Sequence, residues 1–342
     1  MTIEQIKDKL KSKEYDFLRK DKNLGDNIII LTLGGSHAYG TNNEGSDLDI
    51  RGCALNSKMQ ILTNENFEQF VNNETDTTIY AFNKLVALLS NTNPNTIEML
   101  GNKPEHYFYV SPIGQELIDN AHLFLSKRAC HSFGGYANQQ LYRLNQKAAH
   151  QMSQSELEKH ILKMLEFMQT DFTKKYTPYS DDSMKLYIDK AVQEGYDTEI
   201  FMDVNLTHYP LRDYCSMWNE LQNTVRQYGK IGKRNEKAIE HGKIAKHSMH
   251  LIRLYMMCLD ILEKERIITY REDEHDLLMD IRNGKYLDSN DQPIPEFFEM
   301  VNDYEKRLDY AKKNTNLPEN PDYKKINEFI ASVNERVVKG EI

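Results

Sequence analysis

The sequence has few of the features that mark membrane proteins, disulfide-rich proteins and zinc proteins. Its 342 residues include four widely separated cysteines and no Cys-x-x-Cys motif, so neither a disulfide framework nor a zinc knot is expected. No segment approaches the ~18 consecutive apolar residues of a membrane helix. The first residues, MTIEQIKDKLKSKEYDF, are charged and have no apolar signal core. We therefore expect a cytoplasmic protein with no membrane partner.

Positive net charge and histidine metal motifs are also missing. The formal net charge is -9, which argues against a general nucleic-acid coat protein but leaves room for a local basic cleft. Neither His-x-His nor His-Glu-x-x-His occurs, so a zinc enzyme is not indicated, and nothing in the sequence points to a covalent nucleophile. These absences leave a soluble globular protein of two domains as the default for this length.

Three segments of the first hundred residues have the patterns of β-strands. Residues 28–33 form a continuous, β-branched-rich apolar run, which is typical of a central strand. A second strand is predicted over about 48–55. A third is predicted near 67–71 or just beyond it, close to 74–80.

Helical periodicity dominates the rest of the chain. Residues 1–20 are amphipathic, the period becomes helical from Phe82, and Asn93-Pro94 begins a further helix. From about residue 113 onward almost every apolar pattern is helical. We expect an α+β protein with a small α/β domain over residues 1–112 and a mainly α-helical domain over residues 113–342.

The segment LTLGGSHAYGTNNEGSDLDIRG, residues 31–52, contains the two motifs that carry chemistry. Gly34-Gly35-Ser36 follows the first strand, and glycine there lets a phosphate approach the backbone amides while Ser36 donates a hydrogen bond. In an extended segment Asp47 and Asp49 point to one face. Two adjacent carboxylates repel unless a cation lies between them, and Mg²⁺ takes one or two carboxylates together with phosphate oxygens. Each motif alone is more often a plain turn, but together they indicate a magnesium–nucleotide site.

The joint pattern resembles the signature of the DNA polymerase beta superfamily of nucleotidyltransferases. The surrounding sequence resembles one family within that superfamily, the predicted nucleotidyltransferases associated with RNA ligases in RNA repair, called the RlaP family. The segments that carry this resemblance are GGSHAYGTNNEGSDLDIRGC, DTTIY, NPNTIEMLG, FGGYANQQLYRL and KHSMHLIRL. The resemblance implies a polymerase-beta-like catalytic domain with a mixed sheet. It also implies that Asp47, Asp49 and a third carboxylate hold two Mg²⁺ ions, with Mn²⁺ as an alternative.

Two acids are candidates for the third carboxylate, Glu74 and Asp76, which share a face of an extended segment. Asp76 directly precedes the strand-like run Thr77–Tyr80 and matches the acidic position of the family, so it is preferred. The alternative role for Asp76 is to cap the helix that follows.

One helix carries its polar residues on a single side. On a helical wheel of residues 243–262 the apolar residues face the core, and an arc of roughly 120° on the other side contains no acid. The members of that arc are Lys243, Lys246, His247, His250 and Arg253. This basic arc is either an ordinary solvated face or an anion-binding surface, and the second is favoured. We expect the nucleotide to be bound by Gly35, Ser36, Tyr39, Lys246, His250 and Arg253.

The predicted reaction is transfer of a nucleoside monophosphate from an NTP, with ATP expected, to an acceptor hydroxyl with release of pyrophosphate. By resemblance the acceptor is an RNA end, and tRNA is included in that class. Two alternatives stay open: a protein side chain as acceptor, as in nucleotidyltransferases that modify partner toxins, and a nucleotide-sensing regulator without turnover. Tyr136 can either stack on a nucleobase or pack at a helix start, and packing is preferred.

Overall fold

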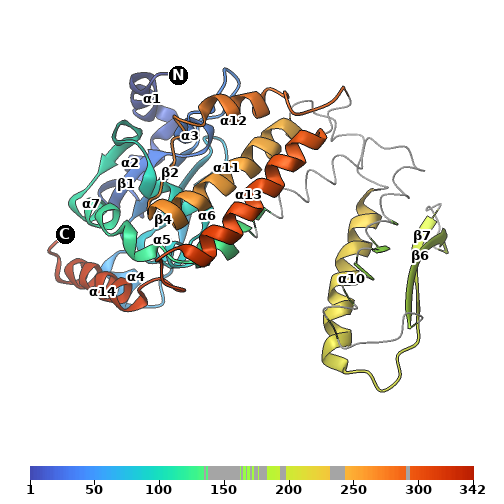
Figure 1. The fold of residues 1–342 in the computed structure, drawn as a ribbon. Coiled ribbons are helices and arrows are strands. Elements are labelled where there is room, and N and C mark those ends of the chain that lie inside the picture. Colours follow the sequence, from blue (N-terminus) through green and yellow to red (C-terminus); the bar gives the residue numbers. More distant parts are fainter. Residues whose placement is uncertain are drawn as a thin grey trace. The chain divides into compact units, whose positions relative to one another are not determined.

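The structure is a computed structural model of the whole chain. It describes residues 1–134, 136–137, 162, 165–166, 168–169, 172, 176, 183–192, 198–231, 243–289 and 293–342. The chain forms two compact units (Figure 1). Unit 1 comprises Met1–Leu141, Ala245–Leu287 and Pro293–Ile342, and unit 2 comprises Tyr142–Ile244 and Asp288–Gln292. Residues 113–342 are thus shared between the two units. The assignment of catalytic and cleft-closing roles to 1–112 and 113–342 stays a prediction.

The elements of the first 124 residues are α1 (Ile3–Leu10), η1 (Lys13–Tyr15), α2 (Phe17–Lys20), η2 (Gly25–Asn27), β1 (Ile28–Leu33), α3 (Gly35–Tyr39), β2 (Ile50–Ala54), α4 (Lys58–Leu62), β3 (Gln69–Asn72), β4 (Thr77–Ala81), α5 (Phe82–Ser90), α6 (Pro94–Ile97), η3 (Glu98–Gly101), η4 (Pro104–His106), β5 (Tyr107–Val110), α7 (Pro112–Asp119) and η5 (Ala121–Phe124). Later elements are β6 (Met184–Lys190), β7 (Thr198–Val204), α10 (Leu211–Ile231), α11 (Lys243–Lys264), α12 (His275–Arg282), α13 (Pro295–Asn314) and α14 (Tyr323–Lys339). The α+β class and the mixed sheet are confirmed.

Unit 1 is built on a five-stranded sheet with the strand order β3-β4-β2-β1-β5. The interior strand β1 is antiparallel to both β2 and β5, while the central strand β2 is parallel to β4. All six residues of β1 are buried, as its continuous apolar run predicts. The strand predicted over 28–33 is therefore confirmed at both ends.

The register of these strands brings three chain segments to one end of the sheet. Leu33 pairs with Ile50 across the antiparallel β1/β2 ladder, so the end of β1 meets the start of β2. Ile50 also pairs with Thr77 in the parallel β2/β4 ladder, so the starts of β2 and β4 lie side by side. The residues just beyond β1 and just before β2 and β4 are consequently neighbours.

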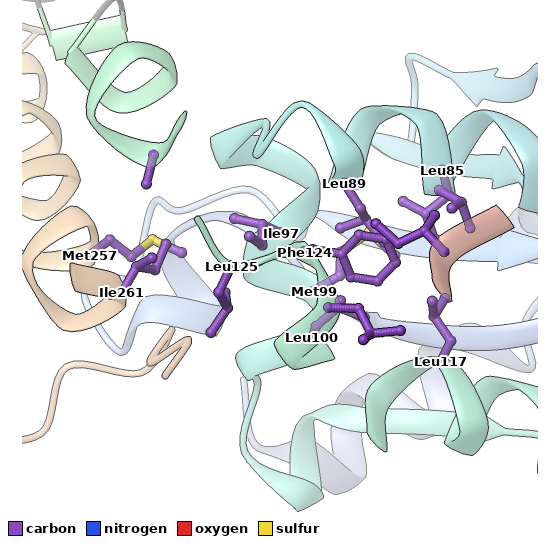
Figure 2. Close-up of a cluster of buried hydrophobic side chains, with 14 of the residues drawn as sticks. Leu85, Leu89, Ile97, Met99, Leu100, Leu117, Phe124, Leu125, Met257 and Ile261 are labelled. Carbon is purple, nitrogen blue, oxygen red and sulfur yellow. The ribbon is translucent and has the colours of Figure 1, made fainter. Parts of the chain in front are cut away.

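Helices cover both faces of the sheet. On one face Ile28, Leu31 and Leu33 pack with the N-terminal segments, whose buried residues include Ile6, Leu10, Tyr15 and Leu18. On the other face the buried cluster joins α5, α7 and η5 to α11. Figure 2 shows part of this second cluster, in which Leu85, Leu89, Ile97, Met99, Leu100, Leu117, Phe124, Leu125, Met257 and Ile261 are labelled. Helix α11 is therefore part of the same hydrophobic core as the sheet.

The helices near the C-terminus pack on one another through specific contacts. The rings of Tyr255 and Tyr304 stack 6.0 Å apart, which places α11 beside α13 (Figure 1). Asn334 on α14 bonds to Asn83 on α5, and Arg336 makes a two-pronged ion pair with Glu116 on α7. Residues 245–287 and 293–342 thus belong to the unit that contains the sheet.

Unit 2 contains a β-hairpin that the helical patterns beyond residue 113 do not predict. Strands β6 and β7 pair in antiparallel register, and one face of the hairpin packs on α10 through Met184, Leu186, Met217 and Leu221. These two segments are exceptions to the mainly helical pattern expected over residues 113–342, which the helices α10 to α14 confirm. The alternation of Met184, Leu186 and Ile188 with Lys185, Tyr187 and Asp189 is the sequence signal that could have identified β6.

Other differences concern the edges of the sheet. The single third strand predicted between 67 and 80 is two strands, β3 and β4, and β5 was not predicted. The helix predicted over 1–20 is divided into α1, η1 and α2. None of the helices in the described part of the chain is long and apolar enough to cross a membrane.

Candidate active site

The glycine–serine turn and the aspartates meet at the end of the sheet described above. The Gly34 amide donates to the Asp49 carbonyl oxygen at 2.9 Å, and the Ile50 amide donates to the Asp76 carbonyl oxygen at 3.2 Å. These bonds continue the β1/β2 and β2/β4 ladders by one residue beyond the strands. Gly34, Asp49 and Asp76 therefore lie on three adjacent segments.

Gly35 gives Asp49 the space that its carboxylate occupies. A Cβ atom on residue 35 would lie 1.8 Å from Oδ2 of Asp49, far inside van der Waals contact. Residue 35 also has a φ of +56°, in the left-handed region that glycine adopts without strain. Helix α3 begins at this residue, and Gly34 is its N-cap. The turn and the Asp49 carboxylate are thus built as one close-packed unit.

The segment that carries the Asp-x-Asp motif is extended but precedes β2. Leu48 and Ile50 are buried, Asp47 is exposed and the Asp49 side chain is 18% exposed. This alternation is the one predicted for an extended segment, with both carboxylates on the face away from the core. The predicted strand over 48–55 is two residues shorter at its start and one at its end.

Of the two candidates for the third carboxylate, Asp76 is the one that lies beside Asp49. Its Oδ1 is 3.6 Å from Nη2 of Arg51, whose same nitrogen is 3.0 Å from Oδ1 of Asp49. Glu74 is exposed, and its backbone amide bonds to Asn72. Asp76 has a φ of +45°, an uncommon value for a residue other than glycine. The geometry favours Asp76, and its role as third carboxylate stays a prediction.

Arg51 supplies the positive charge among these acids. Besides its contacts with the two carboxylates, its Nη1 donates to the carbonyl oxygens of Asp76 at 2.7 Å and Ile50 at 3.1 Å. The side chain is 20% exposed. The sequence patterns described above do not single out Arg51. Its signal is the position directly after Asp-x-Asp-x, on the same strand face as the two aspartates.

Burial raises the pKa of the Asp49 carboxyl to about 7, and Asp76 adds to the rise. The neighbouring Arg51 acts in the opposite direction. A divalent cation would favour the ionised form more strongly than a single guanidinium does, and carboxylate oxygens are the ligands that Mg²⁺ prefers. Within the described residues no three acids, histidines or cysteines are yet close enough to hold an ion. The carboxylates of Asp47, Asp49 and Asp76 are of the ligand type that Mg²⁺ takes, but their role as its ligands stays a prediction, and Arg51 is the counter-charge of Asp49 and Asp76.

The two predicted nucleotide ligands that follow the glycines differ in exposure. Ser36 is half-buried on the first turn of α3, next to Gly35. Tyr39, by contrast, is buried at the end of this helix, where its hydroxyl donates to both carboxylate oxygens of Glu98 at 2.9 Å. The hydroxyl of Tyr39 is therefore engaged inside the protein.

The helical wheel places Arg253 on the polar side of the helix, away from the core, but the structure buries it. Its side chain is fully buried, with Nη1 3.3 Å from Oε2 of Glu98. The guanidinium carbon lies 3.6 Å from the centre of the Tyr39 ring, and Nη2 donates to Nδ1 of His250 at 3.2 Å. The helical wheel gave the angle of Arg253 around α11, but a buried acid on another segment decided its environment.

The rest of the basic arc divides by exposure. Lys246 is exposed, while His247 and His250 are half-buried. The side chain of Lys243 lies outside the described residues. The nucleotide-binding role of Lys246, His250 and Arg253 stays a prediction, and of these three described side chains Lys246 is the exposed one.

Glu98 is a site residue that sequence reasoning missed. It is almost fully buried, and burial raises the pKa of its carboxyl, with Arg253 and Tyr39 acting against that rise. Its signal was a lone acid between Ile97 and Met99 in an otherwise apolar stretch. An acid in such a stretch requires a buried partner.

Tyr136 packs against the core cluster, and its hydroxyl accepts a bond from Nδ2 of Asn93 at 3.4 Å. This contact confirms the preferred packing role.

Comparison with known families gives the same answer as the site. The model of the family RlaP, described as RNA repair pathway DNA polymerase beta family, matches residues 4–332. The match spans nearly the whole chain, and the chain therefore belongs to this family. Membership implies a nucleotidyltransferase role in RNA repair. No curated protein and no solved structure is significantly similar to the chain.

Proposed function

We propose that this member of the RlaP family is a template-independent nucleotidyltransferase that adds a nucleoside monophosphate to the hydroxyl of an RNA end. The observation that carries the proposal is the close packing of Gly35 against the Asp49 carboxylate, beside Asp76. It gives one place where backbone amides can bind phosphate and carboxylates can bind a cation. The family assignment supplies the reaction class.

In the proposed reaction the acceptor oxygen bonds to the α-phosphorus of the NTP. The bond from that phosphorus to the bridging oxygen breaks, pyrophosphate leaves, and the acceptor proton passes to solvent. Residues Gly35 and Ser36 would bind phosphate oxygens through their amides and the serine hydroxyl. Most of the rate enhancement would come from charge neutralisation and in-line positioning.

Asp47, Asp49 and Asp76 would hold two Mg²⁺ ions, or Mn²⁺ in their place. When bound, such ions neutralise phosphate charge and lower the pKa of the acceptor hydroxyl. Arg51 would then be freed from its role as the main counter-charge of Asp49 and Asp76, since both carboxylates would have stronger partners.

ATP is the nucleotide and RNA the acceptor that we propose. Lys246 provides the exposed cation on α11 that can contact an RNA phosphate. We place the reaction in the cytoplasm, because all four cysteines are free.

The deciding experiment incubates the protein with each of the four α-³²P-labelled NTPs and Mg²⁺, with and without total RNA. Label in RNA is the expected result, greatest with ATP. Asp49→Asn should abolish labelling, whereas Glu44→Gln, an exposed acid of the same loop, should leave it unchanged. Label in protein alone would replace RNA by a protein acceptor. Nucleotide binding without label in either would make the protein a nucleotide sensor.

A further inference from the structure

A buried network joins helix α11 to the short helix that follows the glycine–serine turn. Glu98 is its centre: it accepts the Tyr39 hydroxyl at 2.9 Å and forms an ion pair with Arg253 at 3.3 Å. Arg253 closes the network by stacking its guanidinium on the Tyr39 ring, 3.6 Å from the ring centre. Tyr39 is thus held at its hydroxyl and at its ring face.

The backbone around Tyr39 is held as well. Its carbonyl oxygen accepts the Arg271 amide at 3.1 Å. Gly40, with a φ of +77°, ends α3, and a Cβ there would lie 2.5 Å from the Tyr270 ring. Tyr39 is the last residue of the five-residue helix α3, and Gly35 is the first. Three residues separate Tyr39 from Gly35, so a constraint on Tyr39 acts within about one helical turn of the amides at the other end of α3.

The type of contact suggests why charged residues are used. A buried ion pair gains little stability over a well-packed apolar pair, because both ions lose their hydration. Hydrogen bonds to a carboxylate are directional, however, and a guanidinium fits a carboxylate and an aromatic face in a defined orientation. The network therefore specifies one orientation of Tyr39, which apolar packing alone would leave less defined.

We propose that Arg253 and Glu98 are positioning residues: through Tyr39 and α3 they hold the Gly35 and Ser36 amides where the triphosphate binds. Arg253 then contributes to nucleotide affinity without touching the nucleotide, in place of the direct contact predicted from the sequence. This inference rests on the proposed function for its consequence, while the positioning itself is a property of the free protein.

The first test measures the conformation of the turn without nucleotide. Hydrogen–deuterium exchange is followed in Tyr39→Phe, which deletes one oxygen, and in Arg253→Lys, which keeps the charge facing Glu98. We expect faster exchange in the peptide spanning 33–41 and unchanged exchange in β2 and β4. Tyr255→Phe is the matched control. Tyr255 lies on α11, as Arg253 does, and the variant deletes an equivalent hydrogen bond of 2.9 Å from a tyrosine hydroxyl to a glutamate, Glu305 on α13.

The second test measures affinity for a fluorescent, non-hydrolysable ATP analogue in a double-mutant cycle. Each of Tyr39→Phe and Arg253→Lys should weaken binding about 5- to 10-fold, and the double variant should lose little more, because both break one network. If the loss of affinity in the double variant equals the product of the two single losses, Tyr39 and Arg253 act independently. Arg253 would then act on the nucleotide by another route, such as direct contact, and the proposal would be overturned.

The two tests also separate this inference from the proposed function. Suppose that exchange in the 33–41 peptide is faster in the variants, but the wild type does not bind ATP. The proposed function would then be wrong, while the positioning of the turn by Arg253 and Glu98 would stand. Unchanged exchange in the 33–41 peptide of both variants would overturn the positioning, whatever the enzyme does. If Arg253→Lys does not fold, Tyr39→Phe decides the exchange test alone.

Discussion

The missing side chain of Gly35 and the carboxylate of Asp49 occupy the same space. A Cβ on residue 35 would lie 1.8 Å from Oδ2 of Asp49, and residue 35 has a φ of +56°. The turn that we propose to bind phosphate and the acid that we propose to bind a cation are therefore packed directly against each other. This relationship gives the most direct test of the site.

Replacing Gly35 by alanine should disrupt both partners at once. The left-handed backbone alone costs about 1–3 kcal/mol for a residue with a side chain, and the Asp49 carboxylate must also move. We expect a lower melting temperature and loss of nucleotide binding by calorimetry. Gly45→Ala is the control, because a Cβ on residue 45 would lie 3.9 Å from its nearest neighbour, Oδ1 of Asn43. If Gly35→Ala binds nucleotide with the affinity of the wild type, the turn does not bind phosphate and is an ordinary loop.

The third carboxylate can be identified with two matched variants. The side chains of Glu74 and Asp76 are both exposed, but Asp76 lies 3.6 Å from Arg51, which also pairs with Asp49. Asp76→Asn should lower kcat by about 100-fold, which corresponds to about 2.7 kcal/mol of transition-state stabilisation. Glu74→Gln should leave kcat unchanged in the same assay. The reverse pattern would assign the role to Glu74.

Lys246, the exposed residue among the described side chains of the basic arc, can be tested by a single substitution. A double change of Lys246 and Arg253 would not isolate charge at the surface, because Arg253 is buried beside Glu98. If Lys246 contacts an RNA phosphate, Lys246→Gln should weaken RNA binding and reduce the salt slope of log K by about 1. Lys324→Gln, at an 87% exposed side chain, should change neither. An unchanged slope in both variants would make Lys246 an ordinary surface lysine.

Stability should depend on pH through Glu98. Burial raises the pKa of this carboxyl above its ordinary value of 4.5, so the folded protein binds a proton more tightly than the unfolded chain. Its contribution to stability is therefore present below pH 4.5 and is lost as pH rises toward the folded-state pKa. The Tm difference between Glu98→Gln and wild type should shift in favour of the variant as pH rises.

The control for the Glu98 prediction has the opposite sign. The hydrogen bond from Arg336 lowers the pKa of the Glu116 carboxyl, so its contribution is present above the ordinary pKa and is lost on acidification. Glu116→Gln should thus lose stability relative to wild type as pH rises. If Glu98→Gln behaves in the same way, the ion pair with Arg253 outweighs burial at Glu98.

The sequence predicts the secondary structure of this fold well where the local hydrophobic pattern is strong. The apolar run at 28–33 predicted β1 at both ends, and the helical period from Phe82 predicted α5. The short strands β3, β4 and β5, each of four or five residues, were merged or missed. A strand of that length is stabilised by its partners, which the local sequence does not name.

Within the candidate site, the sequence by itself determined the residue types and their local geometry. The glycines, Ser36 and the Asp-x-Asp alternation are encoded in one stretch of 20 residues, and the burial of Leu48 and Ile50 follows from the same alternation. The choice between Glu74 and Asp76 was open, because the two are equivalent in an extended segment. It depends on the parallel pairing of β2 with β4, which sets Asp76 beside Asp49.

The tertiary structure alone decided the environment of Arg253. Helical periodicity fixes the angle of a side chain about its own axis, and that angle is the same whether water or an acid faces it. Glu98, 155 positions earlier in the chain, supplies the acid, and Tyr39 supplies the aromatic face. Contacts between segments so far apart depend on how the whole chain packs, so the sequence could place a cation on α11 but could not show that it is buried beneath the turn.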